Sequence, residues 1–359
     1  MEILNFIENY ILGFFILISI LVFIHELGHY FFAKLFKVKV ESFSIGFGKE
    51  IFGWTDKSGT RWKLALLPLG GYVKMKGEMI SDNNTVGDSD SFQSKYLWQK
   101  ALIVFGGPLF NFIFPIIVLI FITFFSGVPN LIPKIDKILE NSPADKILQN
   151  SDIILAVNNI NIESFSELSD ILSQLPNKNI TLKVQRSNKI IHIDLKVGSK
   201  EYNNKQIGYL GIMADQNSVY FTKYSILDSI QNAYKIYSKV FYLIAEGLLR
   251  LITGNVSKDD FGGPLKIAQL SGDSLKQGLN SWLFFMAMLS INLAVINLFP
   301  IPALDGGHLL IYLVQFIIRR PINLKIQNFL MQIGFFFLMA LMILIILKDF
   351  VSFFFEYIK

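Results

Sequence analysis

Hydrophobic side chains are concentrated in four long runs that contain few charged residues. A transmembrane helix needs about 20 predominantly apolar residues, and each run approaches or exceeds that length. The third run is interrupted by the sequence NLFPIPALDGGH, which contains two prolines, an acidic residue and two glycines. This pattern predicts a polytopic α-helical membrane protein with about four transmembrane helices. The runs cover residues 11–36, 101–125, parts of 282–318, and 329–347.

Residues 128–215 follow a different pattern, in which short segments of alternating hydrophobicity are separated by polar turns. Such alternation is typical of β-strands. Leucine and isoleucine at helical spacing predict one helix over residues 164–175, with Ser164 as its N-cap. This part therefore reads as a compact α+β domain. Its predicted strands are residues 133–139, 151–159, 179–187 and 189–197.

The predicted order is a membrane part at 1–127, the inserted domain at 128–215, and a second membrane part at 216–359. Within the last part, residues 216–280 include a long amphipathic stretch, which is expected to lie on a membrane surface. A fifth span at residues 225–253 stays open, although charged side chains argue against it. These are Asp228, Lys235, Lys239 and Glu246.

Composition and charge support the membrane interpretation, since 52% of the residues are hydrophobic and only 17% are charged. Lysine and arginine collect in residues 34–100 and 319–325, which connect successive runs. The positive-inside bias predicts that both connections are cytoplasmic and that the inserted domain faces outward. The net charge of +5 is then a consequence of membrane topology, so we expect no nucleic-acid partner. The acidic N-terminus also lacks the basic region of a cleaved signal peptide.

The first run contains the sequence HELGH, formed by His25, Glu26 and His29. On a helix, residues i and i+4 lie about 40° apart on one face, so both imidazoles can reach one ion. This is the metalloprotease pattern, in which zinc lowers the pKa of a bound water to about 7. Glu26 is placed to act as general base toward that water. Because ionisable residues are costly in hydrocarbon, metal ligation explains them better than a structural role.

A catalytic zinc needs a third protein ligand, and the chain has no cysteine to supply it. The best candidate is Asp305, at the break in the third run, where Pro300 and Pro302 interrupt the helix. His308 is an alternative third ligand. His192 lies in a strand of the inserted domain, so we interpret it as structural.

Several further motifs accompany HELGH in order: SFSIGFGKE, PLGGYVKMKGE, GGPLFNF, FGGPLKIAQ and NLFPIPALDGG. With them the chain resembles the site-2 protease family of intramembrane zinc metalloproteases, of the bacterial regulator-of-sigma-E protease type. The resemblance implies zinc bound by His25, His29 and Asp305, with Glu26 as general base. It also implies that Asn297 assists in binding the substrate or the reaction intermediate. A helix–helix hydrogen bond is the alternative role for Asn297.

The same resemblance implies a membrane-associated β-hairpin region near the active site, which binds an extended substrate by strand addition. Its glycines are Gly46, Gly48, Gly70 and Gly71. A helical substrate hides its peptide bonds, so an exposed strand edge suits an unwound one. A turn-rich soluble loop is the alternative reading of these glycines.

Residues 128–215 resemble a PDZ domain of the circularly permuted bacterial kind. Its carboxylate-binding loop corresponds to Tyr209, Leu210, Gly211 and Ile212. Backbone N–H groups in such a loop capture a chain terminus. The groove could instead filter substrates by size.

We therefore expect a multipass protease of the bacterial inner membrane that requires Zn²⁺ and cleaves single-span membrane proteins within or near the transmembrane segment. An anti-sigma factor and a remnant signal peptide are both possible substrates. One alternative is a non-catalytic PDZ-containing membrane scaffold with a structural zinc site. The other is a transporter, against which the lack of an inverted repeat argues.

Overall fold

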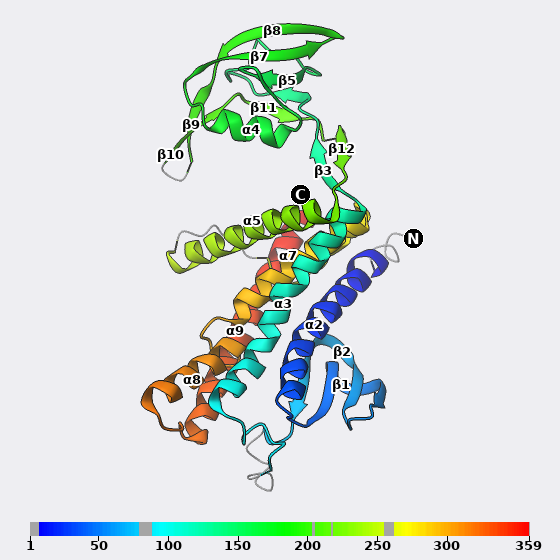
Figure 1. Ribbon diagram of the computed structural model, residues 1–359, viewed down its shortest axis with the longest axis vertical. Coiled ribbons are helices and arrows are strands. Elements are labelled where there is room, and N and C mark those ends of the chain that lie inside the picture. Colours follow the sequence, from blue (N-terminus) through cyan, green and yellow to red (C-terminus); the bar gives the residue numbers. More distant parts are fainter. Residues whose placement is uncertain (1–6, 79–87, 203–204, 217, 255–261, 359) are drawn as a thin grey trace. The chain divides into compact units, whose positions relative to one another are not determined.

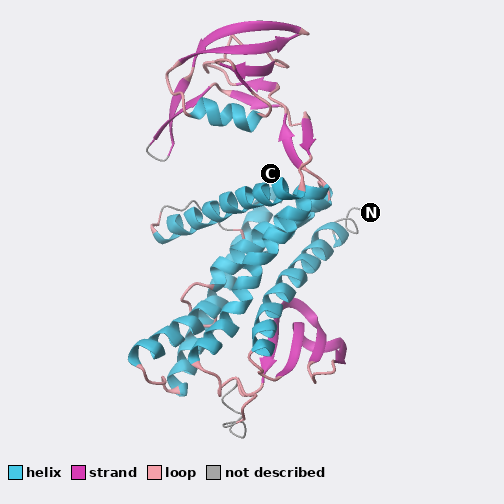
Figure 2. Ribbon diagram, in the orientation of Figure 1, coloured by secondary structure: helices cyan, strands magenta, loops and turns pink. Residues whose placement is uncertain are grey.

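The computed structural model describes residues 7–78, 88–202, 205–216, 218–254 and 262–358 (Figure 1). The chain forms two compact units. The membrane unit comprises Met1–Ile122 and Asp228–Lys359, and the inserted unit comprises Thr123–Leu227. Figure 2 shows that the membrane unit is mainly helical, whereas the inserted unit is mainly strands.

Four helices of the described chain are long and apolar enough to cross a membrane, which confirms the number predicted from the sequence. The first joins a short π-helix, η1 (Ile7–Leu12), to α2 (Gly13–Leu35). The broken third run forms two separate helices. The other three are α3 (Leu97–Phe125), α7 (Leu279–Asn297) and α9 (Leu324–Ile358), and the second half of the broken run forms the shorter α8 (Asp305–Ile318).

A curled β region lies between α2 and α3 in the sequence. It consists of β1 (Val40–Thr55) and β2 (Arg61–Met75), which pair antiparallel. The first half of β1 has β2 on both sides, because Phe43 lies opposite Val73 and also opposite Trp62. The buried Phe43 ring stacks on Trp62, and the same cluster includes Ile103 of α3. The β region is therefore packed against the helices that flank it.

Two further helices complete the membrane unit. The amphipathic α5 (Ile226–Ile252) buries Ala233 in a cluster with apolar side chains of α3 and α7, and it is not among the helices suited to crossing. The shorter α6 (Pro264–Lys276) begins beside α9, where Asp349 accepts hydrogen bonds from the backbone N–H groups of Gly263 and Leu265. These bonds satisfy donors that the first turn of a helix leaves free.

The inserted unit contains a four-stranded sheet in the order β6-β5-β7-β8. The four predicted strands are confirmed, and the predicted helix is α4 (Phe165–Ser173). Ser164 accepts the backbone N–H of Glu167, whose side chain returns a bond to Ser164, so the predicted N-cap is a full capping box. The core includes Ile154, Leu168 and Leu182. The predicted strands are β4 (Ile135–Ile138), β5 (Ile153–Val157), β7 (Asn179–Arg186) and β8 (Lys189–Lys196).

The inserted unit also contains strands that the alternation pattern did not predict, because most are too short to show a period of two. Three two-stranded pairs accompany the main sheet: β10 with β9, β11 with β4, and β12 with β3. The additional strands are β3 (Val128–Leu131), β6 (Ile160–Asn161), β9 (Gly198–Tyr202), β10 (Lys205–Tyr209), β11 (Ile212–Ala214) and β12 (Val219–Thr222).

Candidate active site

Three side chains from two helices converge in the membrane unit. His25 and His29 lie one turn apart on α2, with 3.2 Å between their Nε2 atoms. The Oδ2 atom of Asp305, the first residue of α8, lies 3.2 Å from Nε2 of His25 and 3.6 Å from Nε2 of His29. Among the described residues, this is the one group of His, Asp and Glu side chains that could hold a metal ion.

The triangle of donor atoms has the size that zinc requires. Bonds from zinc to imidazole nitrogen and carboxylate oxygen are about 2.0–2.2 Å, so tetrahedral coordination separates neighbouring donors by about 3.3–3.5 Å. The observed separations of 3.2 and 3.6 Å bracket that range. Oδ2 of Asp305 is buried and accepts no hydrogen bond from the described part of the chain. A cation would satisfy this carboxylate oxygen, which is otherwise costly to bury.

The break between α7 and α8 brings Asp305 to α2. Helix α7 ends at Asn297, and the prolines that follow prevent the helix from continuing. A Cβ atom on Gly306 or Gly307 would overlap backbone atoms of the loop 298–302, so only glycine lets α8 begin this close to it. The loop is therefore folded tightly enough to present Asp305 at the first position of α8.

Helix α3 lies directly against the metal-ligating face of α2. A Cβ atom on Gly28 would overlap the carbonyl oxygen of Gly106. A Cβ atom on Gly107 would overlap the ring of His29 and would lie 2.7 Å from Cε1 of His25. The Nδ1 atom of His29 is 2.9 Å from the carbonyl oxygen of Ile103. This hydrogen bond places the proton on Nδ1 and leaves the Nε2 lone pair free for a metal. In the sequence GGPLFNF is only one motif among several, and its contact with the histidines could not be predicted from it.

Glu26 follows His25 on α2 and is 9% exposed, between the metal donors and β2. The backbone amide of Val73 hydrogen-bonds to its carboxylate. A Cβ atom on Gly71 would lie 3.2 Å from Cγ of Glu26, so β2 passes beside the carboxylate. The structure thus brings Gly71 and Glu26 together.

The other glycines expected at the substrate site lie farther along the curled strands. Gly46 and Gly48 both have φ near +90°, a region that favours glycine. Gly46 is buried against the backbone of Leu67, whereas Gly48 is exposed with open space around its Cα. Gly70 lies against the ring of Phe47. These three glycines shape the β region, and Gly71 is the one of the four whose nearest atoms include Glu26.

Two further predicted residues of the membrane unit, Asn297 and His308, lie outside the group of possible metal donors. Asn297 is the last residue of α7, is half-buried, and forms no hydrogen bond with the described side chains. His308 is not part of the donor triangle, and its ring lies 6.5 Å from the ring of Tyr312, centre to centre. The donor triangle therefore consists of His25, His29 and Asp305.

The residues predicted to bind peptide termini lie in the inserted unit. Tyr209 ends β10, Leu210 is buried in the core, and Gly211 has a φ of +77° that directs the chain into β11. The carbonyl oxygens of Leu210 and Gly211 accept hydrogen bonds from the N–H groups of Ala144 and Leu139. His192 is exposed on β8 opposite Lys183, as expected for a structural residue of a strand.

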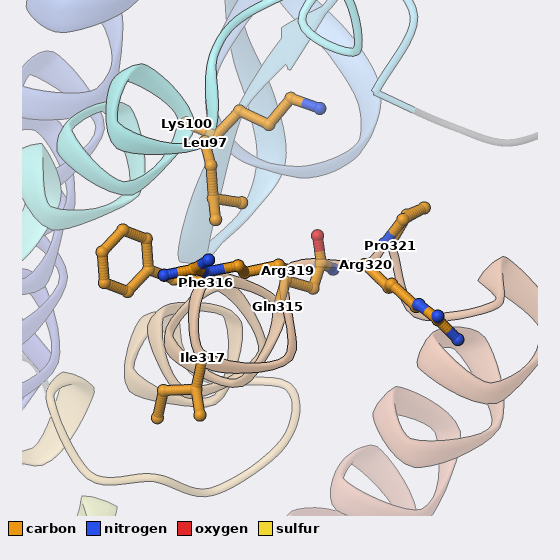
Figure 3. Close-up of a pocket in the computed structure, with 8 residues that line it drawn as sticks. All are labelled: Leu97, Lys100, Gln315, Phe316, Ile317, Arg319, Arg320 and Pro321. Carbon is orange, nitrogen blue, oxygen red and sulfur yellow. The ribbon is translucent and has the colours of Figure 1, made fainter.

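A pocket of about 620 Å³ lies in the membrane unit beside the end of α8. Figure 3 shows three basic side chains at this end of α8, Lys100, Arg319 and Arg320, with Arg319 extending toward Phe316 and Ile317 pointing to the other side of the helix. None of the three metal donors lines this pocket, so we do not assign it to the active site.

Comparison with known proteins agrees with the geometry. The model of peptidase family M50 matches residues 13–341. Relatives named "Putative zinc metalloprotease" include the following proteins from three bacteria. The one from Rickettsia conorii is 37% identical, and the alignment covers 94% of this chain and 98% of the relative. The one from Campylobacter jejuni is 36% identical over 93% and 91%, and the one from Agrobacterium fabrum is 32% identical over 94% and 95%.

Solved structures that are similar to part of the chain include PDZ domains of SdrC-like proteins. The domain from Listeria innocua has 19% identity and a TM-score of 0.21, covering 24% of this chain and 92% of its own. The domain from Listeria monocytogenes has 15% identity and a TM-score of 0.21, covering 23% and 87%. The family match spans both membrane parts and the HELGH sequence, with close relatives along nearly the whole chain. The chain therefore belongs to peptidase family M50, the site-2 protease family, and is an integral membrane zinc metalloprotease.

Proposed function

We propose that this zinc metalloprotease hydrolyses a peptide bond within or near the transmembrane segment of a single-span membrane protein. The observation that carries the proposal is the donor triangle of His25, His29 and Asp305, which lies on helices of a membrane unit. The three side chains are 13%, 11% and 16% exposed, so the site is mostly enclosed but not sealed from water. An enclosed site among apolar helices suits a substrate that is itself a membrane helix.

His25, His29 and Asp305 would hold the zinc. When bound, zinc lowers the pKa of a water ligand to about 7 and polarises a carbonyl group. Glu26 takes a proton from the attacking water as its oxygen bonds to the scissile carbonyl carbon. Glu26 then gives the proton to the leaving amine as the carbon–nitrogen bond breaks. The reaction needs no covalent intermediate with the enzyme.

Substrate would bind as an extended strand along the β region, because β2 passes beside Glu26 at Gly71 and Val73. Strand addition supplies backbone hydrogen bonds that an unwound transmembrane segment lacks in lipid. Several large apolar side chains of the β region are exposed, which supports its association with the membrane. They include Phe47, Ile51, Phe52, Trp54, Leu66 and Leu67.

Two further sites belong to the proposal. Asn297 is free to donate a hydrogen bond from its side-chain amide to the substrate backbone or to the developing oxyanion. In the inserted unit, the loop Tyr209–Ile212 captures a peptide terminus or screens substrates by size, as a PDZ-like domain would. The excess of lysine and arginine in residues 34–100 and 319–325 supports a cytoplasmic location for these connections in a bacterial cell, with the inserted unit outside the inner membrane.

The test reconstitutes the full chain with a single-span model substrate in lipid vesicles and compares three variants. We expect Glu26→Gln to lower the cleavage rate by about 10²–10⁴-fold, because the base is lost, while bound zinc is unchanged. Asp305→Ala should lower zinc content and cleavage together, since it removes one ligand. His308→Ala, at a neighbouring histidine outside the triangle, is the matched control and should retain zinc.

The results separate this proposal from its rivals. Wild-type turnover by the Glu26→Gln variant would exclude the proposed base. Unchanged zinc in Asp305→Ala combined with zinc loss in His308→Ala would move the third ligand to His308. An unaltered protein that binds zinc but cleaves no membrane-embedded substrate would support a scaffold with a structural zinc site.

A further inference from the structure

One face of α3 contacts both histidines. Residues 103, 107 and 111 are spaced by four, so they form a single stripe along the helix. The carbonyl oxygen of Ile103 accepts the hydrogen bond of His29 Nδ1, and Gly107 leaves room for both rings. Asn111, one turn farther, places its side-chain amide 3.2 Å from Nδ1 of His25. Each histidine therefore has its own partner on α3.

Asn111 is fixed from two directions. Pro115 has no backbone N–H, so the carbonyl oxygen of Asn111 lacks its usual helical partner. The hydroxyl of Ser290, on α7, donates a hydrogen bond of 2.9 Å to that oxygen. Both Asn111 and Ser290 are fully buried. The asparagine is thus anchored at its backbone while its side chain faces the metal-ligating helix.

The metal site determines which end of the amide must face His25. A neutral imidazole carries one proton, and Nε2 of His25 must give its lone pair to the metal. Nδ1 then carries the proton and requires an acceptor. The amide oxygen of Asn111 is buried and accepts no hydrogen bond from the described residues. A half-turn about the last side-chain bond exchanges the amide nitrogen and oxygen in space and brings the oxygen to Nδ1.

We propose that Asn111 is a positioning residue of the zinc site, whose amide oxygen accepts the Nδ1 proton of His25. This contact fixes the tautomer and the ring orientation that direct Nε2 toward the metal. It is the counterpart of the bond from His29 to Ile103, but here a side chain provides the acceptor. The inference rests on the zinc site of the proposed function and adds a residue from a third helix to it.

The test measures the zinc dissociation constant of the purified full-length protein in detergent, by competition with a chromophoric chelator. Asn111→Leu keeps the approximate volume but removes the acceptor, and we expect zinc binding about 10–100-fold weaker. Asn111→Asp restores an oxygen acceptor and should bind zinc within a few-fold of the unaltered protein. Asn232→Leu makes the same exchange at a half-buried asparagine of α5, whose amide bonds the carbonyl oxygen of Asp228, and it should leave zinc affinity unchanged.

The apo-protein's thermal unfolding separates positioning from a general packing role. If Asn111 positions His25, the Asn111→Leu variant has a weaker zinc affinity. Its apo-protein then unfolds at a temperature close to that of the Asn111→Asp apo-protein. Equal zinc affinity in Asn111→Leu and the unaltered protein would overturn it. Equally weak zinc binding by the Leu and Asp variants, with both apo-proteins destabilised, would also overturn it and leave a packing role. If the zinc site of the proposed function is wrong, the unaltered protein itself binds no stoichiometric zinc, which distinguishes that failure from the failure of the Asn111 proposal.

Discussion

The inserted unit is stabilised by large apolar side chains, whereas glycines bring α2 and α3 into contact. In the inserted unit, Ile154, Leu168 and Leu182 are fully buried in one apolar core. Where α2 meets α3, the closest contact is made by Gly28 and Gly106, with no side chain between the two backbones. Water drives the burial of apolar side chains, but lipid is as apolar as leucine. Helices in lipid gain more from close backbone contact and from hydrogen bonds.

This difference has a consequence for the chemistry. The glycine contact brings α3 so close to α2 that the Ile103 carbonyl and the Asn111 amide reach the histidine rings. A leucine-rich interface would separate the helix axes and leave Nδ1 of each ring without a partner. In the membrane unit, therefore, the same contact packs the helices and brings hydrogen-bond partners to His25 and His29. In the inserted unit, the core stabilises the fold of that unit.

The largest expected effect comes from breaking the glycine contact. Gly28→Val puts a branched side chain where even a Cβ atom overlaps the Gly106 carbonyl, so α2 and α3 must separate. We expect loss of stoichiometric zinc, measured on purified protein by metal analysis. Gly247→Val is the matched control, because the Cβ position of this α5 glycine has no atom within 4 Å. Full zinc retention by Gly28→Val would show that the close contact is not needed for the site.

A core truncation in the inserted unit should destabilise that unit and leave the zinc content of the protein unchanged. Leu182 is fully buried on β7, so Leu182→Ala should lower the free energy of unfolding of this unit by about 2–5 kcal/mol. Hydrogen exchange of the β7 backbone amides in the intact protein measures this loss. Zinc content should not change. A loss of zinc of the same size as in Gly28→Val would show that the two units are not energetically separate.

The smallest effects come from two serines that each satisfy a free backbone group. Ser164 caps α4 in the inserted unit, and Ser164→Ala should lower the free energy of unfolding of that unit by about 1 kcal/mol. Ser290 bonds the free carbonyl of Asn111, and Ser290→Ala should cost about 0.6 kcal/mol, the average for such bonds between membrane helices. Hydrogen exchange of α4 and denaturation of the membrane unit measure the two losses. A much larger cost for Ser290→Ala would mean that lipid strengthens this hydrogen bond beyond that average.

Much of the local structure could be predicted because it depends on short stretches of sequence. The lengths of the apolar runs predict helices that could span a membrane, and alternation predicts β5, β7 and β8. The spacing of His25 and His29 places both imidazoles on one face of a helix whatever the rest of the chain does. The curling of β1 between two parts of β2 could not be predicted, because its pairing joins distant residues through irregular register.

The sequence by itself determined which residues could ligate a metal, since the chain lacks cysteine and carries HELGH and an aspartate at a break in apolar runs. Only the tertiary structure decided that Asp305 lies 3.2 Å from His25 and that Gly71 lies beside Glu26. Only the tertiary structure brought Ile103 and Asn111 to the far side of the rings. The physical reason is that hydrophobic periodicity encodes which face of a helix is polar or apolar. In lipid it does not encode which helices meet, since that depends on small residues and on individual polar groups.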